Sequence, residues 1–238
     1  MRRVRIFVLA AAVFALLLLL LSGPGTKNDW WDWRVGLVMY QVAAYLGLAS
    51  AAVALLLVLL MAHPRHRAYP WVPISAVCLG LLAAAPPMIF KGRASRVPPI
   101  HDITTDTQDP PAFATLAAVR EQGPNKPAYG GPDVASQQLQ AYPDIKPKVL
   151  PVPPPEAVQK AIDAARSLGW QIAGSDTAAG RIEATDTTGW FGFKDDIVIR
   201  VRPQAQGSRI DVRSASRVGR SDVGKNAERI RDFLDKLG

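Results

Sequence analysis

Apolar residues gather in three long runs within the first ninety positions, Val4–Leu21, Val35–Met61 and Trp71–Phe90. About 20 apolar residues are enough to cross a hydrocarbon core of roughly 30 Å as a helix. Aromatic residues stand before the second and third runs, as is typical of the membrane–water interface. The pattern therefore predicts a membrane region over residues 1–96 with three transmembrane helices.

The basic residues around these runs predict their orientation. Met1–Arg5 is a basic cluster, and no A-x-A-like cleavage site follows the first run, so we expect an uncleaved signal anchor. The basic residues divide evenly between the two sides, with His63–Arg67 taken as a cytoplasmic loop. Because the first helix usually dominates, we expect a cytoplasmic N-terminus in the inner (plasma) membrane and a periplasmic or extracellular C-terminal domain.

Small residues in the second run favour close helix packing. Ala43, Gly47 and Ala51 recur every four residues, which lets another helix approach. Pro86-Pro87 is expected to kink or end the third helix. Cys78 is the sole cysteine, so the chain forms no intrachain disulfide and has no cysteine-based zinc site.

The pattern changes after Arg96, and we expect one extracytoplasmic α+β domain over residues 97–238. Its first part, residues 97–153, is rich in proline and is expected to be extended chain with one short helix around Pro111–Gln122. A long irregular stretch inside a compact domain is unusual. We therefore expect it to lie over the folded core, on a sheet face or along an edge.

Residues 154–238 have the regular alternation of a folded core. Apolar spacing and turn residues predict a helix, four strands and a helix, at 154–168, 170–175, 181–187, 193–202, 209–216 and 222–237. The short connections favour an antiparallel sheet with both helices on one face.

The charge distribution separates the two regions. The net charge is +8 and the pI about 9.9. Residues before 97 hold ten Lys/Arg and two Asp, whereas the 18 basic and 18 acidic residues of the domain cancel. The basic character therefore belongs to the membrane region, which predicts the lipid bilayer as a partner and no nucleic acid.

The densest polar segment in the domain joins the last strand to the last helix. A helix start offers free backbone N–H groups to an anion, and arginine matches carboxylate or phosphate. We expect a site for an anionic envelope ligand or a protein partner here, made by Arg213, Ser214, Ser216, Arg217, Gly219, Ser221, Asp222 and Asn226. The alternative is a structural corner, because Asp222 can cap the helix and Arg213 can pair with Asp196 or Glu183.

A second polar cluster offers the ingredients of acid–base or metal chemistry. His101, Asp102 and Asp106 would serve an envelope hydrolase if they converged with the corner around Arg217–Ser221. Their spacing matches no metal motif, and a polar turn explains them as well. We therefore expect no metal and no cofactor.

A third cluster places paired carboxylates beside aromatic residues. Asp195 and Asp196 are adjacent on a strand and point to opposite faces, so they do not act together on one bond. The aromatics Trp190, Phe191 and Phe193 are expected on a hairpin, where they would touch the membrane or the proline-rich cover, or dock a scaffold on a partner. No nucleophile elbow, P-loop, dinucleotide fingerprint or zinc motif is present.

Several short motifs of the domain resemble the domain-of-unknown-function family 1499, which is mainly bacterial. They occur in the family's order and are Ile100–Asp106, Asp109–Phe113, Tyr142–Ile145, Gly180–Ala184, Phe193–Asp196 and Arg213–Asp222. The resemblance implies a single domain beginning near Val97, often preceded by membrane spans, and it implies no activity. We therefore expect a membrane-anchored envelope protein with a binding role.

Overall fold

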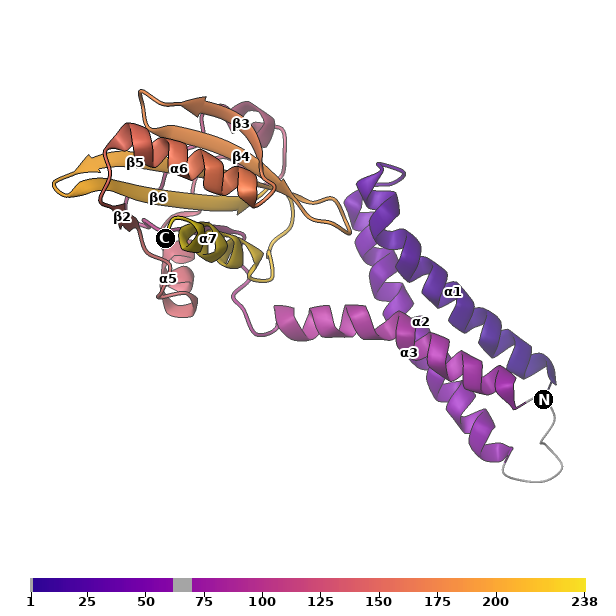
Figure 1. Cartoon of the computed structure of the whole chain (residues 1–238). Coiled ribbons are helices and arrows are strands. Elements are labelled where there is room, and N and C mark those ends of the chain that lie inside the picture. Colours follow the sequence, from indigo (N-terminus) through magenta and orange to yellow (C-terminus); the bar gives the residue numbers. More distant parts are fainter. Residues whose placement is uncertain (1, 62–69) are drawn as a thin grey trace. The chain divides into compact units, whose positions relative to one another are not determined.

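The computed structural model describes residues 2–61 and 70–238, which form two compact units (Figure 1). The first unit contains the chain up to Arg93 together with Gly189–Gly192. The second contains Ala94–Thr188 and Phe193–Gly238. Each unit is described by itself.

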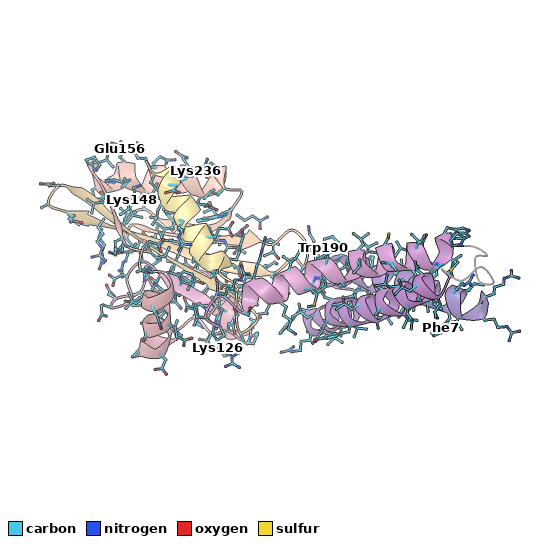
Figure 2. The ribbon with its side chains drawn as sticks, turned by 90° about the horizontal axis from the view of Figure 1, so that it is seen from below. Phe7, Lys126, Lys148, Glu156, Trp190 and Lys236 are labelled. Carbon is cyan, nitrogen blue, oxygen red and sulfur yellow. The ribbon has the colours of Figure 1, made fainter. Side chains whose placement is uncertain are left out.

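The first unit consists of three helices that are long and apolar enough to cross a membrane: α1 (Arg2–Lys27), α2 (Trp33–Leu60) and α3 (Trp71–Ala94). This confirms three long apolar helices at the positions where the sequence predicts membrane spans. Large apolar side chains such as Phe7, which is 74% exposed, stand on the outside of the helices (Figure 2). The proline pair does not end α3, which continues to Ala94 and changes direction along its length (Figure 1).

The small residues of α2 let the backbones of two helices touch. A Cβ atom added to Gly47 would lie 2.5 Å from the carbonyl oxygen of Gly80, and one added to Gly80 would lie 2.5 Å from that of Gly47. Glycine is therefore required on both sides, and the predicted packing role of the stripe is confirmed. The expected cytoplasmic loop His63–Arg67 lies outside the described residues.

The second unit is built on one antiparallel sheet with the strand order β1-β6-β5-β4-β3, and β2 also pairs with β6. The strands are β1 (Asp102–Thr104), β2 (Lys148–Leu150), β3 (Gln171–Asp176), β4 (Arg181–Thr187), β5 (Lys194–Gln204) and β6 (Gly207–Ser216). The expected four-stranded sheet is wrong, because the proline-rich segment adds β1 and β2. These have three residues each, too few to show a period-two pattern.

Two amphipathic helices, α6 (Pro154–Ser167) and α7 (Lys225–Lys236), cover one face of the sheet as predicted (Figure 1). Their apolar sides join the inward residues of the strands in the main core. Trp170 and Phe233 stack there with ring centroids 5.4 Å apart. The last helix starts three residues later than predicted, because Val223 and Gly224 adopt left-handed backbone angles (φ 56° and 82°).

The first part of the proline-rich segment covers the other face, as predicted, whereas its later residues Tyr142, Ile145 and Leu150 join the main core. It contains the short helix α4 (Ala117–Glu121), which lies within the predicted helical stretch, and α5 (Gly131–Ala141), which was not predicted. Phe113 and Leu116 pack against Val198 and Ala215 of the sheet. The buried carboxylate of Glu183 accepts hydrogen bonds from three successive backbone N–H groups at 114–116 (2.8–3.0 Å). This segment is therefore part of the fold.

A side chain closes the outer edge of β1. The amide nitrogen of Thr104 donates to Oε1 of Gln138 (2.9 Å), and Nε2 of Gln138 donates back to the carbonyl oxygen of Thr104 (2.6 Å). Gln138 is fully buried. Its carboxamide thus takes the hydrogen-bonding place that a neighbouring strand would occupy.

Candidate binding corner

The segment between β6 and α7, which we call the corner loop (residues 217–224), is held in place from several sides. Asn125 Nδ2 donates to the carbonyl oxygens of Ser216 and Gly219 (3.0 and 2.9 Å). The Asp222 carboxylate accepts from the amides of Gly224 and Asn226 (2.9 and 2.7 Å), which are the N-cap residue and the second residue of α7. Burial raises the pKa of Asp222 despite these two bonds, and the charge of Asp195 raises it further.

Three of the predicted site residues lie beneath the loop and join β6 to α7. Asn226 Oδ1 accepts from Ser214 Oγ (2.7 Å), and Asn226 Nδ2 donates to Ser216 Oγ (3.1 Å) and to the carbonyl oxygen of His101 (2.9 Å). All three side chains are buried. They form the internal support of the corner and offer no exposed polar atom to a ligand.

Arg213 is enclosed by the fold and is 2% exposed. Its Nε and Nη2 form a bidentate pair with Asp102 (2.9 and 2.7 Å), and its Nη groups also donate to the carbonyl oxygens of Pro111 and Pro127. The guanidinium lies over Phe113, 4.9 Å from the ring centroid. The expectation that Arg213 pairs with Asp196 or Glu183 is wrong, because β1 places Asp102 next to it.

Asp196 is the centre of a second buried cluster on the same face. It accepts from Arg120 Nη1 (3.0 Å), from Thr185 Oγ1 (2.8 Å) and from Arg217, whose Nε and Nη2 approach within 2.9 and 2.8 Å. Burial lowers the pKa of Arg120, although the bond to Asp196 opposes this effect. The side chain of Arg217 is 21% exposed, so the edge of this cluster reaches the surface.

Asp195 points to the opposite face of the sheet, as predicted. Arg229 Nη2 donates to Asp195 (2.8 Å), and Arg229 Nε donates to Asp186 (2.9 Å). The adjacent carboxylates Asp195 and Asp196 are therefore neutralised by different arginines on different faces.

His101, Asp102 and Asp106 do not converge on one point. Asp102 accepts hydrogen bonds from Arg213, whereas Asp106 accepts from Arg209 Nη2 (2.7 Å) in a separate cluster. Burial alone would raise the pKa of Asp106, but bonds from the amides of residues 108 and 109 and nearby arginine charges lower it overall. Within residues 2–61 and 70–238 the His101 ring makes no hydrogen bond or ion pair, and no group of three His, Cys, Asp or Glu is placed to hold a metal.

The comparison with known families fits this architecture. Residues 102–237, more than half of the sequence, match the family described as "Protein of unknown function (DUF1499)". The chain belongs to the DUF1499 family. The match begins at the first residue of β1 and ends just after α7, so the DUF1499 region includes the cover and the corner loop. No curated protein matches the sequence.

The DUF1499 domain also contains site residues that the sequence analysis missed, namely Arg120, Asn125, Thr185 and Arg229. Arg120 lies in the short helix α4 and Asn125 in the irregular chain after it, and both reach the corner only through tertiary packing, so no local pattern marked them. A signal was present for Arg229. Asn226, Arg229, Ile230 and Phe233 share one buried face of α7, and a charged residue inside such a stripe indicates a buried partner.

At the surface of the corner, only some of the basic side chains are left without an acidic partner among the described residues. Arg220 at the tip of the loop and Lys194 at the start of β5 are exposed, and their side chains make no hydrogen bond or ion pair with any residue that the structure describes. Trp190, between β4 and β5, is 44% exposed. The corner of the DUF1499 domain thus combines a neutralised interior with an exposed basic rim.

Proposed function

We propose that this DUF1499 protein is a membrane-anchored binding protein of the cell envelope. In this proposal α1–α3 cross the inner membrane, the N-terminus is cytoplasmic, and the domain faces the periplasm or the exterior. Arg2, Arg3 and Arg5 at the start of α1 support this orientation under the positive-inside rule.

The recognition element in this proposal is the corner loop, and its ligand is an anionic group. The observation that carries the proposal is that hydrogen bonds fix the loop backbone, while one exposed arginine on the loop forms no ion pair with the described residues. Asn125 and Asp222 hold the backbone, whereas the exposed Arg220 has no partner in the part of the chain that the structure describes. A loop ordered in advance loses little entropy when it binds.

A buried phenol beside the loop supports a polar ligand at this place. Tyr142 is 7% exposed, and its hydroxyl has no hydrogen-bond partner among the described residues. A Cβ atom added to Gly224 would lie 3.4 Å from this hydroxyl. Buried polar groups are nearly always satisfied, so a ligand or ordered water at the start of α7 would complete this one.

The backbone of the loop gives a further sign of function. Val223 adopts a left-handed conformation (φ 56°), which is strained for a β-branched residue and costs about 1–3 kcal/mol. Such strain persists only where the surrounding contacts impose it. Here it turns the chain so that Asp222 reaches the helix start and Arg220 stays at the surface.

The test measures anion-dependent stability of the full chain in nanodiscs of zwitterionic lipid. Inorganic phosphate and pyrophosphate are compared with chloride at equal ionic strength. A ligand at 100 times its Kd adds about 2.7 kcal/mol and raises the melting temperature of the domain. Arg220→Gln should remove this rise without changing the melting temperature in chloride, because Arg220 has no partner in the described fold.

The matched control is Lys236→Gln, which removes one exposed positive charge at the far end of α7 (Figure 2). It should leave the rise with phosphate intact. Equal responses of the wild type, Arg220→Gln and Lys236→Gln would overturn an anion site at the corner loop. The exposed rim would then have to be tested against protein partners.

A further inference from the structure

The helix α2 has two faces of different character. On its packed face, small residues such as Gly36 and Gly47 bring its backbone close to the backbones of α1 and α3 (Figure 1). The opposite face is exposed, and it carries the polar side chains of Gln41 and Tyr45. These polar groups therefore point away from the helices that α2 contacts.

Gln41 lies well inside the expected membrane span. It follows Trp33, the first residue of α2, by eight positions, which is about 12 Å along the helix axis. The 28 residues of α2 span about 42 Å, so a hydrocarbon core of roughly 30 Å centred on the helix begins about 6 Å from its start. Gln41 thus lies inside this core, and Tyr45 lies one helical turn deeper.

Neither polar side chain on this face is satisfied by the fold. Within residues 2–61 and 70–238, Gln41 and Tyr45 form no side-chain hydrogen bond. Ser22 and Thr26 of α1 differ, because their hydroxyls donate to carbonyl oxygens of their own helix (2.7 and 2.9 Å). Lipid tails offer no hydrogen bond, and an unpaired carboxamide in hydrocarbon is costly. The Gln41 carboxamide therefore needs a partner from outside the described chain.

A second copy of this chain supplies such a partner by symmetry. Copies inserted in the same orientation are related by a two-fold axis along the membrane normal, so identical residues lie at the same depth. A carboxamide contains both donors and an acceptor. Two Gln41 side chains that meet at this axis can therefore bond each other reciprocally.

The spacing of the exposed face also fits a parallel pair of helices. Gln41, Tyr45, Leu48 and Ala52 are all exposed and follow one another at intervals of four, three and four residues. This is the spacing of the seam in a left-handed helix pair. Ala52 is small enough for two backbones to approach, and Tyr45 and Leu48 supply larger surfaces for packing.

We propose that this protein forms a parallel dimer in the membrane through the exposed face of α2, with the two Gln41 carboxamides hydrogen-bonded to each other. The inference goes beyond the proposed function and rests on it only in that α1–α3 cross the bilayer. The interface belongs to the membrane helices alone. It is therefore independent of where the DUF1499 domain lies.

Disulfide cross-linking of the full chain locates the interface. Cys78→Ala removes the sole natural cysteine, and one new cysteine is placed on the exposed side of each helix: Leu17→Cys in α1, Leu48→Cys in α2 or Leu82→Cys in α3. Each variant is oxidised with copper phenanthroline in phosphatidylcholine vesicles at a low ratio of protein to lipid. We expect covalent dimers with Leu48→Cys alone, whereas random collisions would link all three variants.

Sedimentation equilibrium in density-matched micelles measures the strength of the dimer. Gln41→Leu removes the reciprocal hydrogen bonds and should weaken association roughly tenfold, whereas Gln41→Asn keeps the carboxamide and should preserve most of it. Ala52→Leu places a bulky side chain in the seam and should also weaken the dimer. The matched control is Ala85→Leu, at an exposed position of α3, which should leave association unchanged. None of these positions is buried, so the helix content should stay constant.

Three outcomes overturn the inference: a monomer at all concentrations, equal cross-linking at 17, 48 and 82, or an equally strong dimer with Gln41→Leu. Extraction of the vesicles with alkaline carbonate tests the span itself, and release of the chain would refute both the membrane anchoring and this interface. If the anchored chain cross-links at 48 but phosphate does not stabilise it, the dimer stands and the anion site falls. If phosphate acts through Arg220 but no cross-link forms at 48, the dimer alone falls.

Discussion

The two faces of the DUF1499 sheet are both buried, yet they are built from opposite chemistry. The face under α6 and α7 is closed mainly by aliphatic and aromatic side chains, with the buried Asp195–Arg229 pair at one end, whereas the face under the proline-rich cover holds Asp102, Asp196, Asp211 and Arg213. Asp196 and Ile197 are neighbours on β5, both fully buried, and each belongs to a different face. Burial alone therefore does not define the core of this domain.

The difference lies in what each face requires of its partners. Apolar burial is non-directional and follows the area removed from water. A buried charge is tolerated only when its partners stand at the right distance and angle, and losing one partner leaves the other unpaired. We therefore expect the helix-covered face to tolerate small changes of shape and the ionic face to tolerate almost no change of charge.

The largest effect should come from separating Arg213 and Asp102. Asp102→Ala leaves a guanidinium that is 2% exposed without its carboxylate, and should cost about 3–5 kcal/mol of unfolding free energy. The double variant Asp102→Ala/Arg213→Met should lose less than this single variant, because no buried charge remains. Urea unfolding of the full chain in detergent, followed by tryptophan fluorescence, measures both.

On the apolar face, a double variant should lose more unfolding free energy than either single variant, which is the opposite of the order expected for Asp102 and Arg213. Phe233→Ala combined with Ile230→Ala should cost more than either single change, because each removes buried area. If the Asp102/Arg213 double variant were less stable than Asp102→Ala, the contrast between the faces would be wrong.

A smaller effect is expected from two nearly size-preserving changes at adjacent positions. Asp196→Asn keeps the volume but removes the charge between Arg120 and Arg217, and should cost about 3 kcal/mol. Ile197→Val removes one methylene from the apolar core and should cost about 0.5–1.5 kcal/mol. Equal losses in the same urea assay would show that the ionic face is no more demanding than the apolar one.

The smallest effects should appear as opposite pH dependences of two carboxylates. The pKa of Asp106 is lowered from 3.8, so its contribution to stability is present above that value and is lost as pH falls through the lowered pKa. The pKa of Asp222 is raised from 3.8, so the folded state weakens as pH rises from that value through the raised pKa.

Replacement by asparagine should remove each slope while keeping the shape of the side chain. Asp106→Asn should flatten the loss of stability in acid, and Asp222→Asn should remove the decline at higher pH. The free energy of unfolding is measured for both variants across the acidic range. The difference in unfolding free energy between wild type and variant should therefore change with pH in opposite directions for the two substitutions. A change in the same direction would contradict the assigned causes of the two pKa shifts.

The fold was predictable where one physical signal dominated. The strand at Arg181–Thr187 and the helix beginning at Pro154 have clear periods and clear ends, and their bounds agree with the structure to within a residue. β1 and β2 were not predicted, because three residues are too few to show the two-residue alternation of a strand. α5 begins at Gly131 and buries the polar Gln138. Its buried face therefore forms no apolar stripe, and the sequence pattern did not predict this helix.

The position of the candidate corner could be predicted from the sequence, but the pairing of its charged side chains could not. The density of Arg, Ser and Gly located the corner, and alternation along β5 correctly separated Asp195 from Asp196. The partners of Arg213 and Asp196 come from β1 and α4, about 110 and 75 residues away along the chain. Such pairings follow from the path of the cover, which no local pattern specifies.

The carboxamide of Gln138 on the backbone of Thr104 has a consequence for crowding. A protein anchored in a bilayer diffuses in two dimensions, where neighbouring copies meet often and in similar orientations. An open strand edge would then template lateral polymerisation from copy to copy. Gln138 terminates the hydrogen-bonding ladder at β1, and at the opposite edge β3 carries a register shift between Ile172 and Gly174 that breaks its regular spacing. Both of these edges therefore carry features that oppose growth of the sheet by strand pairing.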